Sequence, residues 1–429
     1  MTSALLALSN APSGINAGDT AWVLVSAALV LFMTPGLALF YGGMVRAKNV
    51  LGIIMQSFFC MGIVSVLWVL VGFSLAFGRD AGGGLIGGLG LAGLRGIGAG
   101  VPGFHLTVPP LAFVAFQMMF AIITPALITG ATADRLRFTG FAVFVAVWLV
   151  LVYCPIAHWS FSPGGWLYHR GALDFAGGTV VEINSGFSSL AAALVVGRRR
   201  GWPEELMSPH SLPFTLLGAG ILWFGWFGFN AGSALSAGPV ATQALIDTQL
   251  AAAAGLLGWV LVEALRTGGK PTTLGAASGA VAGMVAITPC AGFVGTLPSI
   301  GIGLVAGVVC LLAVSFKFRH RYDDSLDVVA VHGVGGIVGM VLLGLFAARA
   351  LNPAGANGLA SGGGLHLLGE QFLATVTCMG YAFGATYVVA RVVDRLVGLR
   401  VPADQEDEGL DTSQHAESAY GASGFGRIH

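Results

Sequence analysis

Apolar residues fill long stretches of this chain, and short polar segments separate them from one end to the other. Eleven stretches approach or exceed the ~20 residues that a helix needs to cross a bilayer. The pattern predicts an all-α polytopic membrane protein with eleven transmembrane helices. We expect these helices at about 20–41, 50–77, 109–128, 141–156, 174–198, 211–231, 242–265, 274–290, 297–316, 327–346 and 365–393.

The number of spans predicts the organisation of the chain. Five spans per half force the second half to insert upside down relative to the first, which gives the inverted repeat common in transporters. We expect one transmembrane domain over 1–400, with halves at about 20–200 and 211–346 and one extra helix at 365–393. The remaining residues, 401–429, form a polar and acidic tail.

Composition agrees with this class and excludes others. The chain is 55% hydrophobic and 9% charged, whereas soluble domains are about 25% charged. It has 66 glycines, about twice the average usage, which favours closely packed membrane helices. With zero net charge and no basic patch, nucleic acid is not an expected partner. The five cysteines lack paired spacing and predict neither a disulfide nor a metal site.

Charge placement predicts the orientation of the chain in the membrane. With the N-terminus outside, only four of the twenty basic residues fall on the outer side, namely Arg79, Arg95, Arg170 and Arg349. The other sixteen are on the inner side, as the positive-inside rule requires. The first 19 residues lack a basic region, so we expect no cleaved signal peptide. We therefore expect a protein of the inner (plasma) membrane with a cytoplasmic tail.

Glu182 is a carboxylate inside an otherwise apolar span. On a helix it shares one face with small and polar residues at spacings of three or four: Thr179, Ser185, Gly186 and Ser189. A buried carboxylate in a membrane is energetically costly and usually faces a cavity or pathway. A protonated glutamate satisfied by a neighbouring helix is the structural alternative.

His332 occupies the tenth span, the position that matches the fifth span in an inverted repeat. The glycines at 333, 335, 336 and 339 give its helix a face that can pack closely against a partner. We expect the imidazole to lie near Glu182 at the midplane. Two ionisable residues at matching positions favour a pathway over a purely structural role.

Several long motifs resemble the ammonium transporter family, which includes the Amt, methylammonium permease and Rhesus proteins, and its Amt branch in particular. The resemblance covers nearly the whole chain through MTPGLALFYGGMVRAKNVL (33–51), AFQMMFAIITPALITGATADRLRF (115–138), DFAGGTVVEINSG (174–186), GWFGFNAGS (225–233), GKPTTLGAASGAVAGMVAITP (269–289) and DDSLDVVAVHGVGGIVG (323–339). It implies an eleven-helix protomer in a homotrimer, with a hydrophobic pore in each protomer. The implied function is transport of ammonium or ammonia, with methylammonium as a further candidate substrate and without enzymatic activity or cofactor.

The resemblance also implies roles for individual residues. Phe120 and Phe229 match the two phenyl rings that gate the pore from outside. Ammonium would be recruited above them, at an outer site that Phe116 lines and where the hydroxyl of Ser233 accepts a hydrogen bond. The family usually has a second recruiting aromatic, a tryptophan; here Phe161 takes that place, and phenylalanine holds a cation more weakly.

Further matches concern the lumen and its surroundings. Trp226 and Thr288 match pore-lining positions below the gate. Asp174 matches a carboxylate near the outer end of the fifth helix, about 12 Å of helix rise before Glu182. We interpret it as a helix cap that also lowers the local potential for a cation.

At Glu182 the sequence departs from the family, because most members carry histidine there and form an imidazole pair with the residue matching His332. A glutamate resembles a minority of members, including some fungal permeases. It must be protonated or paired with a protonated His332, and either state can relay a proton. Relay along the pair predicts electrogenic ammonium transport, which we favour; return of the proton outside predicts an electroneutral ammonia channel.

The tail resembles the family's regulatory C-terminus, which couples protomers and in bacteria meets PII-type signalling proteins. Asp324, Asp327 and Tyr420 are the residues we expect at this inner regulatory surface. A disordered acidic tail is the alternative. An ammonium sensor with little transport is the rival function, although only 29 residues follow Arg400.

Overall fold

The computed structural model describes residues 14–420. Within that range the regular secondary structure is helical, and extended segments form only isolated bridges. Ten helices are long and apolar enough to cross a membrane, and a shorter apolar helix, Thr273–Ile287, is the eleventh. The predicted all-α class is therefore confirmed. The expectation about a signal peptide rests mainly on residues 1–13, and part of the predicted tail is 421–429; both segments lie outside the described residues.

The eleven spanning units follow the chain in order. They are α2 (Ala17–Met44); η1, α3, η2 and α4 (Ala47–Asn49, Val50–Leu67, Trp68–Gly72, Phe73–Phe77); α5 and η5 (Pro110–Ile128, Thr129–Thr132); α6, η6, α7 and α8 (Phe138–Trp148, Leu149–Tyr153, Cys154–Phe161, Trp166–Arg170); η7 and α9 (Gly178–Ile183, Asn184–Val196); α10 (Leu212–Gly232); α11 (Pro239–Arg266); α12 (Thr273–Ile287); α13 and α14 (Thr296–Val314, Phe316–His320); η8 and α15 (Val329–Val334, Gly335–Phe346); and α16 (His366–Leu396).

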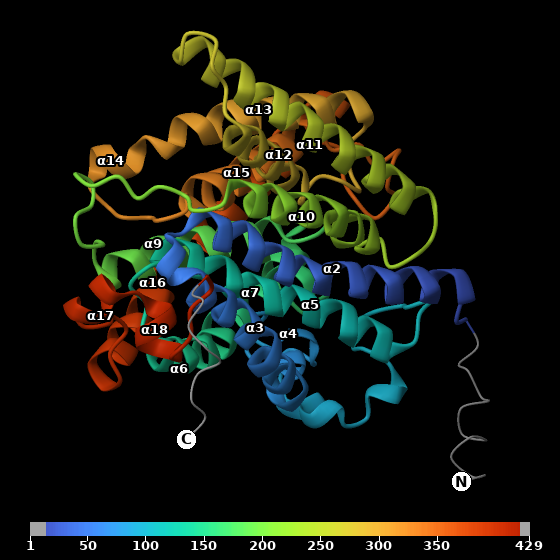
Figure 1. The fold of residues 1–429 in the computed structure, drawn as a ribbon. Coiled ribbons are helices and arrows are strands. Elements are labelled where there is room, and N and C mark those ends of the chain that lie inside the picture. The colour runs from blue at the N-terminus through green and yellow to red at the C-terminus, as the bar shows by residue number, and fades with distance from the viewer. Residues whose placement is uncertain (1–13, 421–429) are drawn as a thin grey trace.

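Short helices occupy the loops and the tail. Three single-turn 3-10 segments lie between spans, η3 (Leu89–Leu94), η4 (Ile97–Ala99) and η9 (Leu359–Ser361). The tail folds into α17 (Ala403–Glu408) and α18 (Leu410–His415). Both tail helices lie at one end of the bundle, opposite the end where α2 begins (Figure 1).

Side-chain caps explain the start of three helices. The Asn16, Ser211 and Thr272 side chains accept a backbone N–H in the first turns of α2, α10 and α12, as capping residues do. The fourth span is longer than predicted, because α7 continues beyond Ile156 to Phe161 and α8 extends to Arg170. The π-helical turn η6 precedes Pro155, which takes a first-turn position of α7, where proline is tolerated.

The two halves pack as an inverted repeat. Helix α2, the first of one half, packs along α10, the first of the other, and the fifth and tenth spans meet through α9, η7 and η8. Contacts within the first half, α2 with α5 and α3 with α6, have counterparts in α10 with α12 and α11 with α13. The fifth and tenth spans therefore meet where the two halves join.

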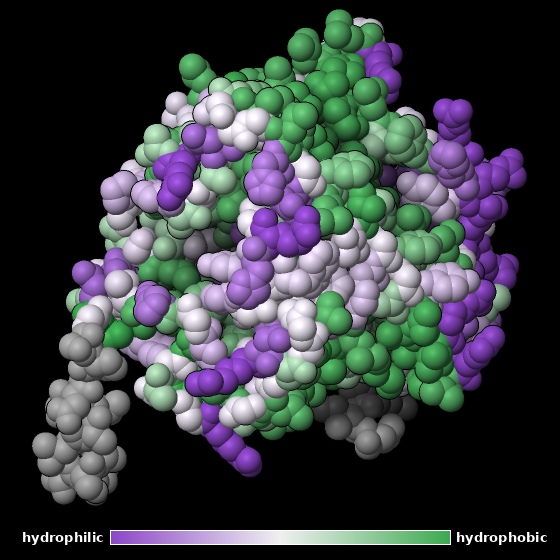
Figure 2. Space-filling model, turned by 180° about the vertical axis from the view of Figure 1, so that it is seen from behind, coloured by the Kyte–Doolittle hydropathy of each residue, from purple (hydrophilic) through white to green (hydrophobic). Residues whose placement is uncertain are grey.

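The outer surface of the bundle is suited to lipid. Large apolar side chains are exposed on several spanning helices, among them Phe32, Leu217, Phe224, Leu257 and Leu304. Figure 2 shows broad apolar areas on one face and a concentration of hydrophilic residues along the edge nearest the tail helices. The chain is a multi-pass membrane protein.

Candidate functional site

A carboxylate and an imidazole meet at the centre of the protomer. The Oε2 atom of Glu182 lies 2.7 Å from Nδ1 of His332, and the two residues are 1% and 5% exposed. Glu182 comes from η7 and His332 from η8, two π-helical segments at matching places in the repeat. The π-helical turn is rare and frequent at functional sites. The structure thus brings together the two residues that the sequence places at equivalent positions.

Glycines allow this approach. A Cβ atom on Gly186 would lie 2.3 Å from Cα of Gly333, so the two helices cross with backbone against backbone. One turn further, a Cβ on Gly336 would lie 3.0 Å from Cβ of Glu182. Any larger side chain at this crossing would push the helices apart and separate Glu182 from His332.

Each of the two helices starts at an aspartate cap. Asp174 accepts hydrogen bonds from the backbone N–H groups of Gly177, Gly178 and Thr179 at 2.6–2.8 Å. Asp324 accepts from Val328 and Val329 at 3.1 and 2.7 Å. In both halves the cap stands eight residues before the central group. The geometry at Asp174 is that of the helix cap inferred from the sequence.

Aromatic rings form a column beside the pair, and it includes the predicted gate of Phe120 and Phe229. The rings of Phe120 and Phe229 are 4.3 Å apart between centroids, and Phe116 and Trp226 extend the column on either side, at 4.9 Å from Phe120 and 5.5 Å from Phe229. All four are buried. Phe161 is half-buried and does not belong to this column of ring contacts among the described residues.

Below the gate lies a narrow apolar lumen. It is lined by Trp226, Phe229, Glu182 and His332 and by apolar residues that sequence reasoning had not singled out: Met33, Leu37, Phe40, Ile123, Leu127, Val181, Leu222 and Val281. It offers about 10 Å³ to the centre of a water-sized molecule, about the room that one water requires. Only a very small molecule fits at one time.

His332 also lines a second, larger cavity. This vestibule of about 230 Å³ opens on the side of Asp327, Glu263 and Tyr41. The imidazole thus lines both the lumen and the vestibule, whereas Glu182 lines the lumen and not the vestibule. The pair therefore stands between the narrow apolar lumen and a larger cavity that has charged residues in its lining.

The remaining candidates take different places. The Ser233 hydroxyl lies just beyond the gate helix and donates to the Phe229 carbonyl at 2.8 Å, which leaves its lone pairs available as acceptors. Thr288 lies behind Trp226 and does not line the lumen. Asp327 lines the vestibule and pairs with Lys317 at 2.6 Å. Tyr420 is exposed and bonded to Nε2 of His210 at 2.8 Å.

Asp324 was expected at the inner regulatory surface, and its side chain is in fact buried at 1% exposure. Burial and the neighbouring carboxylate of Asp327 raise the pKa of Asp324 to about 6. Its capping role could have been inferred from the sequence, because it precedes His332 by the same eight residues that separate Asp174 from Glu182.

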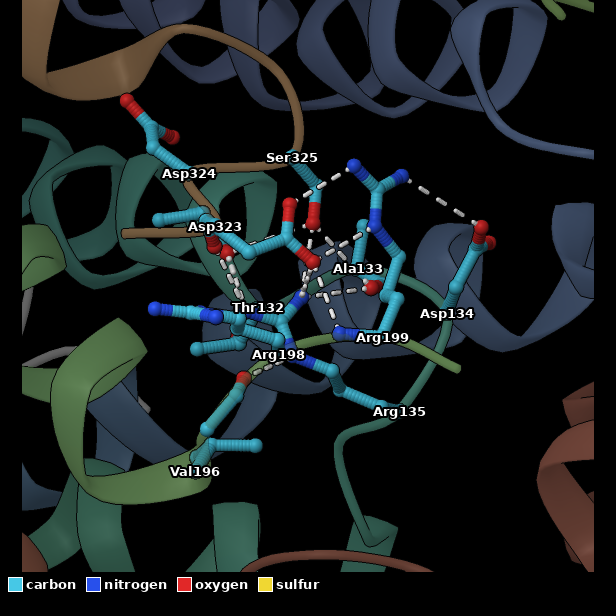
Figure 3. A network of polar contacts seen from close by, with 12 residues as sticks. Thr132, Ala133, Asp134, Arg135, Val196, Arg198, Arg199, Asp323, Asp324 and Ser325 are labelled. Atoms are coloured by element: carbon cyan, nitrogen blue, oxygen red, sulfur yellow. Dashed lines mark hydrogen bonds and ion pairs between the residues drawn. The ribbon is translucent and has the colours of Figure 1, made fainter. Parts of the chain in front are cut away.

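A charged network beside Asp324 joins three loops at this end of the bundle, which follow η5, follow α9 and precede η8 (Figure 3). Arg199 donates to both carboxylate oxygens of Asp323 at 2.8–2.9 Å and lies 3.7 Å from Asp134. Arg135 bonds the Ser325 hydroxyl at 2.7 Å and the Asp323 carbonyl at 2.6 Å. Burial alone would raise the pKa of Asp323, but the hydrogen bonds and charges of the arginines outweigh it and lower that pKa.

The tail docks onto the same network. Glu406, 1% exposed, accepts from the Arg200 backbone N–H and from the Arg400 guanidinium, both at 2.7 Å. Asp411 accepts from the Gly52 backbone N–H at 2.8 Å in the first turn of α3. Residues 401–420 are thereby held on the ends of spans of the first half.

The described residues include no cluster that could hold a metal ion. The sequence pattern of the Ammonium Transporter Family matches residues 21–420. The chain belongs to the ammonium transporter family. This membership accounts for the combination of an aromatic gate, a narrow apolar lumen and buried ionisable groups in one bundle.

Similar proteins cover nearly the whole chain. An ammonium transporter from Mycobacterium tuberculosis H37Rv is 50% identical over 433 residues, with 94% of this chain and 90% of the relative covered. Ammonium transporter Amt1 from Archaeoglobus fulgidus is 47% identical over 403 residues, covering 94% and 99%.

Solved structures show the same fold. The crystal structure of Saccharomyces cerevisiae Mep2 superposes with a TM-score of 0.85 at 36% identity, covering 91% of this chain and 92% of that one. A structure described as a sensor Amt protein superposes with a TM-score of 0.84 at 29% identity, covering 93% and 98%. The fold of this ammonium transporter family member is thus shared with Mep2 and with a protein described as a sensor.

Proposed function

We propose that each protomer moves ammonium inward by splitting it into ammonia and a proton. Ammonium is recruited outside at Phe116, Phe161 and Ser233, and loses its water at the rings of Phe120 and Phe229. It is deprotonated near this gate. Ammonia then crosses the lumen, and the proton passes through Glu182 and His332. The direct Glu182–His332 hydrogen bond is the observation that carries this proposal.

The size and polarity of the lumen support the splitting step. A lumen with room for about one water cannot keep ammonium hydrated, and an ion stripped of water in an apolar surrounding is strongly disfavoured. Neutral ammonia avoids this energy. The proton then needs hydrogen-bonding groups of its own, and within the lumen lining these are the carboxylate and imidazole of the pair.

The placement of the pair supports inward relay. At 2.7 Å, the Glu182 carboxylate and the His332 ring nitrogen are within proton-transfer distance. Since His332 also lines the vestibule, its ring can receive a proton on one side and release it on the other. Relay makes net transport electrogenic, whereas return of the proton outside would make it electroneutral.

The experiment is an ammonium concentration jump on proteoliposomes adsorbed to a solid-supported membrane. We expect a transient inward current together with ammonia accumulation. Ammonia flux without current would contradict relay and favour the electroneutral channel.

The docked tail supports a regulatory proposal. Glu406 holds the loop that contains Arg200; the adjacent Arg199 holds Asp323; and Asp324, next to Asp323, caps the helix of His332. We propose that a homotrimer, with N-termini outside and tails in the cytoplasm, meets a PII-type protein at this face. Co-purification with a PII protein, reversed by ATP and 2-oxoglutarate, tests it; no complex under any nucleotide condition would contradict it.

A sensor is the second candidate function, because a sensor Amt protein shares the fold. Growth of a transporter-deleted yeast on low ammonium distinguishes the two. Rescue supports transport, whereas ammonium binding without rescue or flux supports a sensor.

A further inference from the structure

The wall of the lumen directly below the gate is an indole held from behind. Trp226 lines the lumen and lies against the ring of Phe229 at 5.5 Å and an interplanar angle of 44°. Its Nε1–H donates to Oγ1 of Thr288 at 2.9 Å. Thr288, fully buried, comes from the end of α12, whereas Trp226 comes from α10.

The direction of this hydrogen-bond chain is fixed. The Oγ1 atom of Thr288 lies 2.8 Å from the carbonyl oxygen of Met284, which can only accept. The threonine proton is therefore committed to Met284, and its lone pair is left for Trp226. An indole has one donor and no acceptor, so each of the three groups has a single arrangement.

The other lining groups are fixed by packing. Most of the lumen wall is aliphatic, and Met33, Leu37, Leu222 and Val281 among the lining residues are at most 2% exposed, so the close-packed interior leaves them little room to retreat. Trp226 is rigid, fixed at its face by Phe229 and at its edge by Thr288. It therefore sets the width of the lumen at the level where a substrate enters.

We infer that the Trp226–Thr288 hydrogen bond determines selectivity for ammonia over methylamine. With room for about one water, the lumen accepts ammonia, but the extra methyl group of methylamine requires a wall to move. Moving the indole breaks its bond to Thr288 and leaves a buried N–H unpaired, which is disfavoured. Thr288 thus acts as a positioning residue behind the lumen. This inference rests on the proposed transport function.

The test is Thr288→Val, which keeps the shape of the side chain and removes the acceptor. Loss of one such hydrogen bond shifts an equilibrium about fivefold. We expect the ratio of methylammonium to ammonium uptake in proteoliposomes to rise about fivefold. Thr288→Ser, which keeps the hydroxyl, should leave the ratio unchanged. Thr375→Val, at a buried threonine of α16, is the matched control and should also leave it unchanged.

An unchanged ratio in Thr288→Val with ammonium uptake intact would overturn the inference, as would an equal rise in Thr288→Ser. If Thr288→Val does not fold, Trp226→Phe is the variant to test. It replaces the indole by a smaller ring and removes the hydrogen-bond donor, so it too must raise the ratio of methylammonium to ammonium uptake.

A second readout does not depend on transport. In protein labelled with 5-fluorotryptophan, the ¹⁹F resonance missing from Trp226→Phe belongs to Trp226. It should be a single narrow line in the wild type and broaden or split in Thr288→Val. An unchanged line in Thr288→Val would overturn the inference, whether or not the wild type transports ammonium. Absence of transport by the wild type would contradict only the proposed function.

Discussion

At the scale of single residues, the carboxylate of Glu182 has to hold a proton or share one with a neighbour. At 1% exposure, an isolated charge would be strongly disfavoured, and His332 is the partner within hydrogen-bond distance. A carboxylate–imidazole pair can carry a net charge, whereas two neutral imidazoles cannot. Both kinds of pair offer the same hydrogen-bonded path for a proton.

Glu182→His is therefore expected to retain transport. The imidazole would hydrogen-bond His332 and relay a proton as the carboxylate does, so the uptake rate in proteoliposomes should stay within about tenfold of the wild type. Glu182→Leu, which fills the space without a titrating group, is the control and should lose proton-coupled uptake. Full activity of the leucine variant would contradict the role of the pair.

Asp324 predicts a pH dependence of stability. Its pKa of about 6 in the folded protein exceeds the ~3.9 of an unfolded aspartate. The folded protein thus binds this proton more tightly, so the group's contribution to stability is largest below about pH 4 and is lost as pH rises to about 6. As pH rises from about 4 to about 6, the melting temperature of the wild type should fall by a few degrees relative to that of Asp324→Asn. A constant difference would contradict this prediction.

Sequence predicted some of these residues better than others. Glu182, His332 and Asp174 stand out because charge in an apolar span is rare. Thr288 was expected in the lumen wall but lies behind Trp226. A sequence motif does not show the rotamer of a side chain or its depth behind the wall. Met33 and Leu37 line the lumen yet look like any apolar residue of a span, so no signal separates them from core positions.

At the scale of helices, the crossing of the fifth and tenth spans sets the distance within the pair. Backbone contact at Gly186 and Gly333 is possible because neither has a side chain. The π-helical segments η7 and η8 then turn Glu182 and His332 toward each other. The sequence predicted the glycine face, but not the π-helical turns, which have no reliable local signature.

Gly186→Ala should therefore impair transport. A Cβ at 2.3 Å from Cα of Gly333 forces the helices apart by about 1 Å, and a shift of that size can lower a rate by about a hundredfold. We expect ammonium uptake to fall by about tenfold or more. Gly220→Ala is the matched control, because a Cβ there meets nothing within 4 Å. Equal effects of the two variants would contradict the argument.

At the scale of the whole molecule, the protein is an inverted repeat with a tail clamped onto the first half. The repeat was predictable from the number of spans. The docking of the tail was not, since it depends on buried partners far apart in sequence, such as Glu406 with Arg200. A run of acidic residues alone favours a solvated segment.

Glu406→Ala should release the tail. It removes the acceptor of Arg200 and Arg400 and leaves partly buried donors without partners, which weakens the docking of the tail. Cleavage within residues 401–420 by a nonspecific protease should become about tenfold faster or more. Glu408→Ala, at an exposed position of the same helix, should not change the rate. Equal protection in Glu406→Ala and the wild type would show that other contacts hold the tail.

The most direct test of the central claim compares the wild type with Glu182→Gln in the concentration-jump experiment. Glutamine keeps the shape of the side chain but cannot release or accept a proton as the carboxylate does. The wild type is predicted to give a transient current on an ammonium jump. In Glu182→Gln, incorporated at equal density and folded, the current should fall sharply. An undiminished current would show that Glu182 is structural and that the proton takes another path.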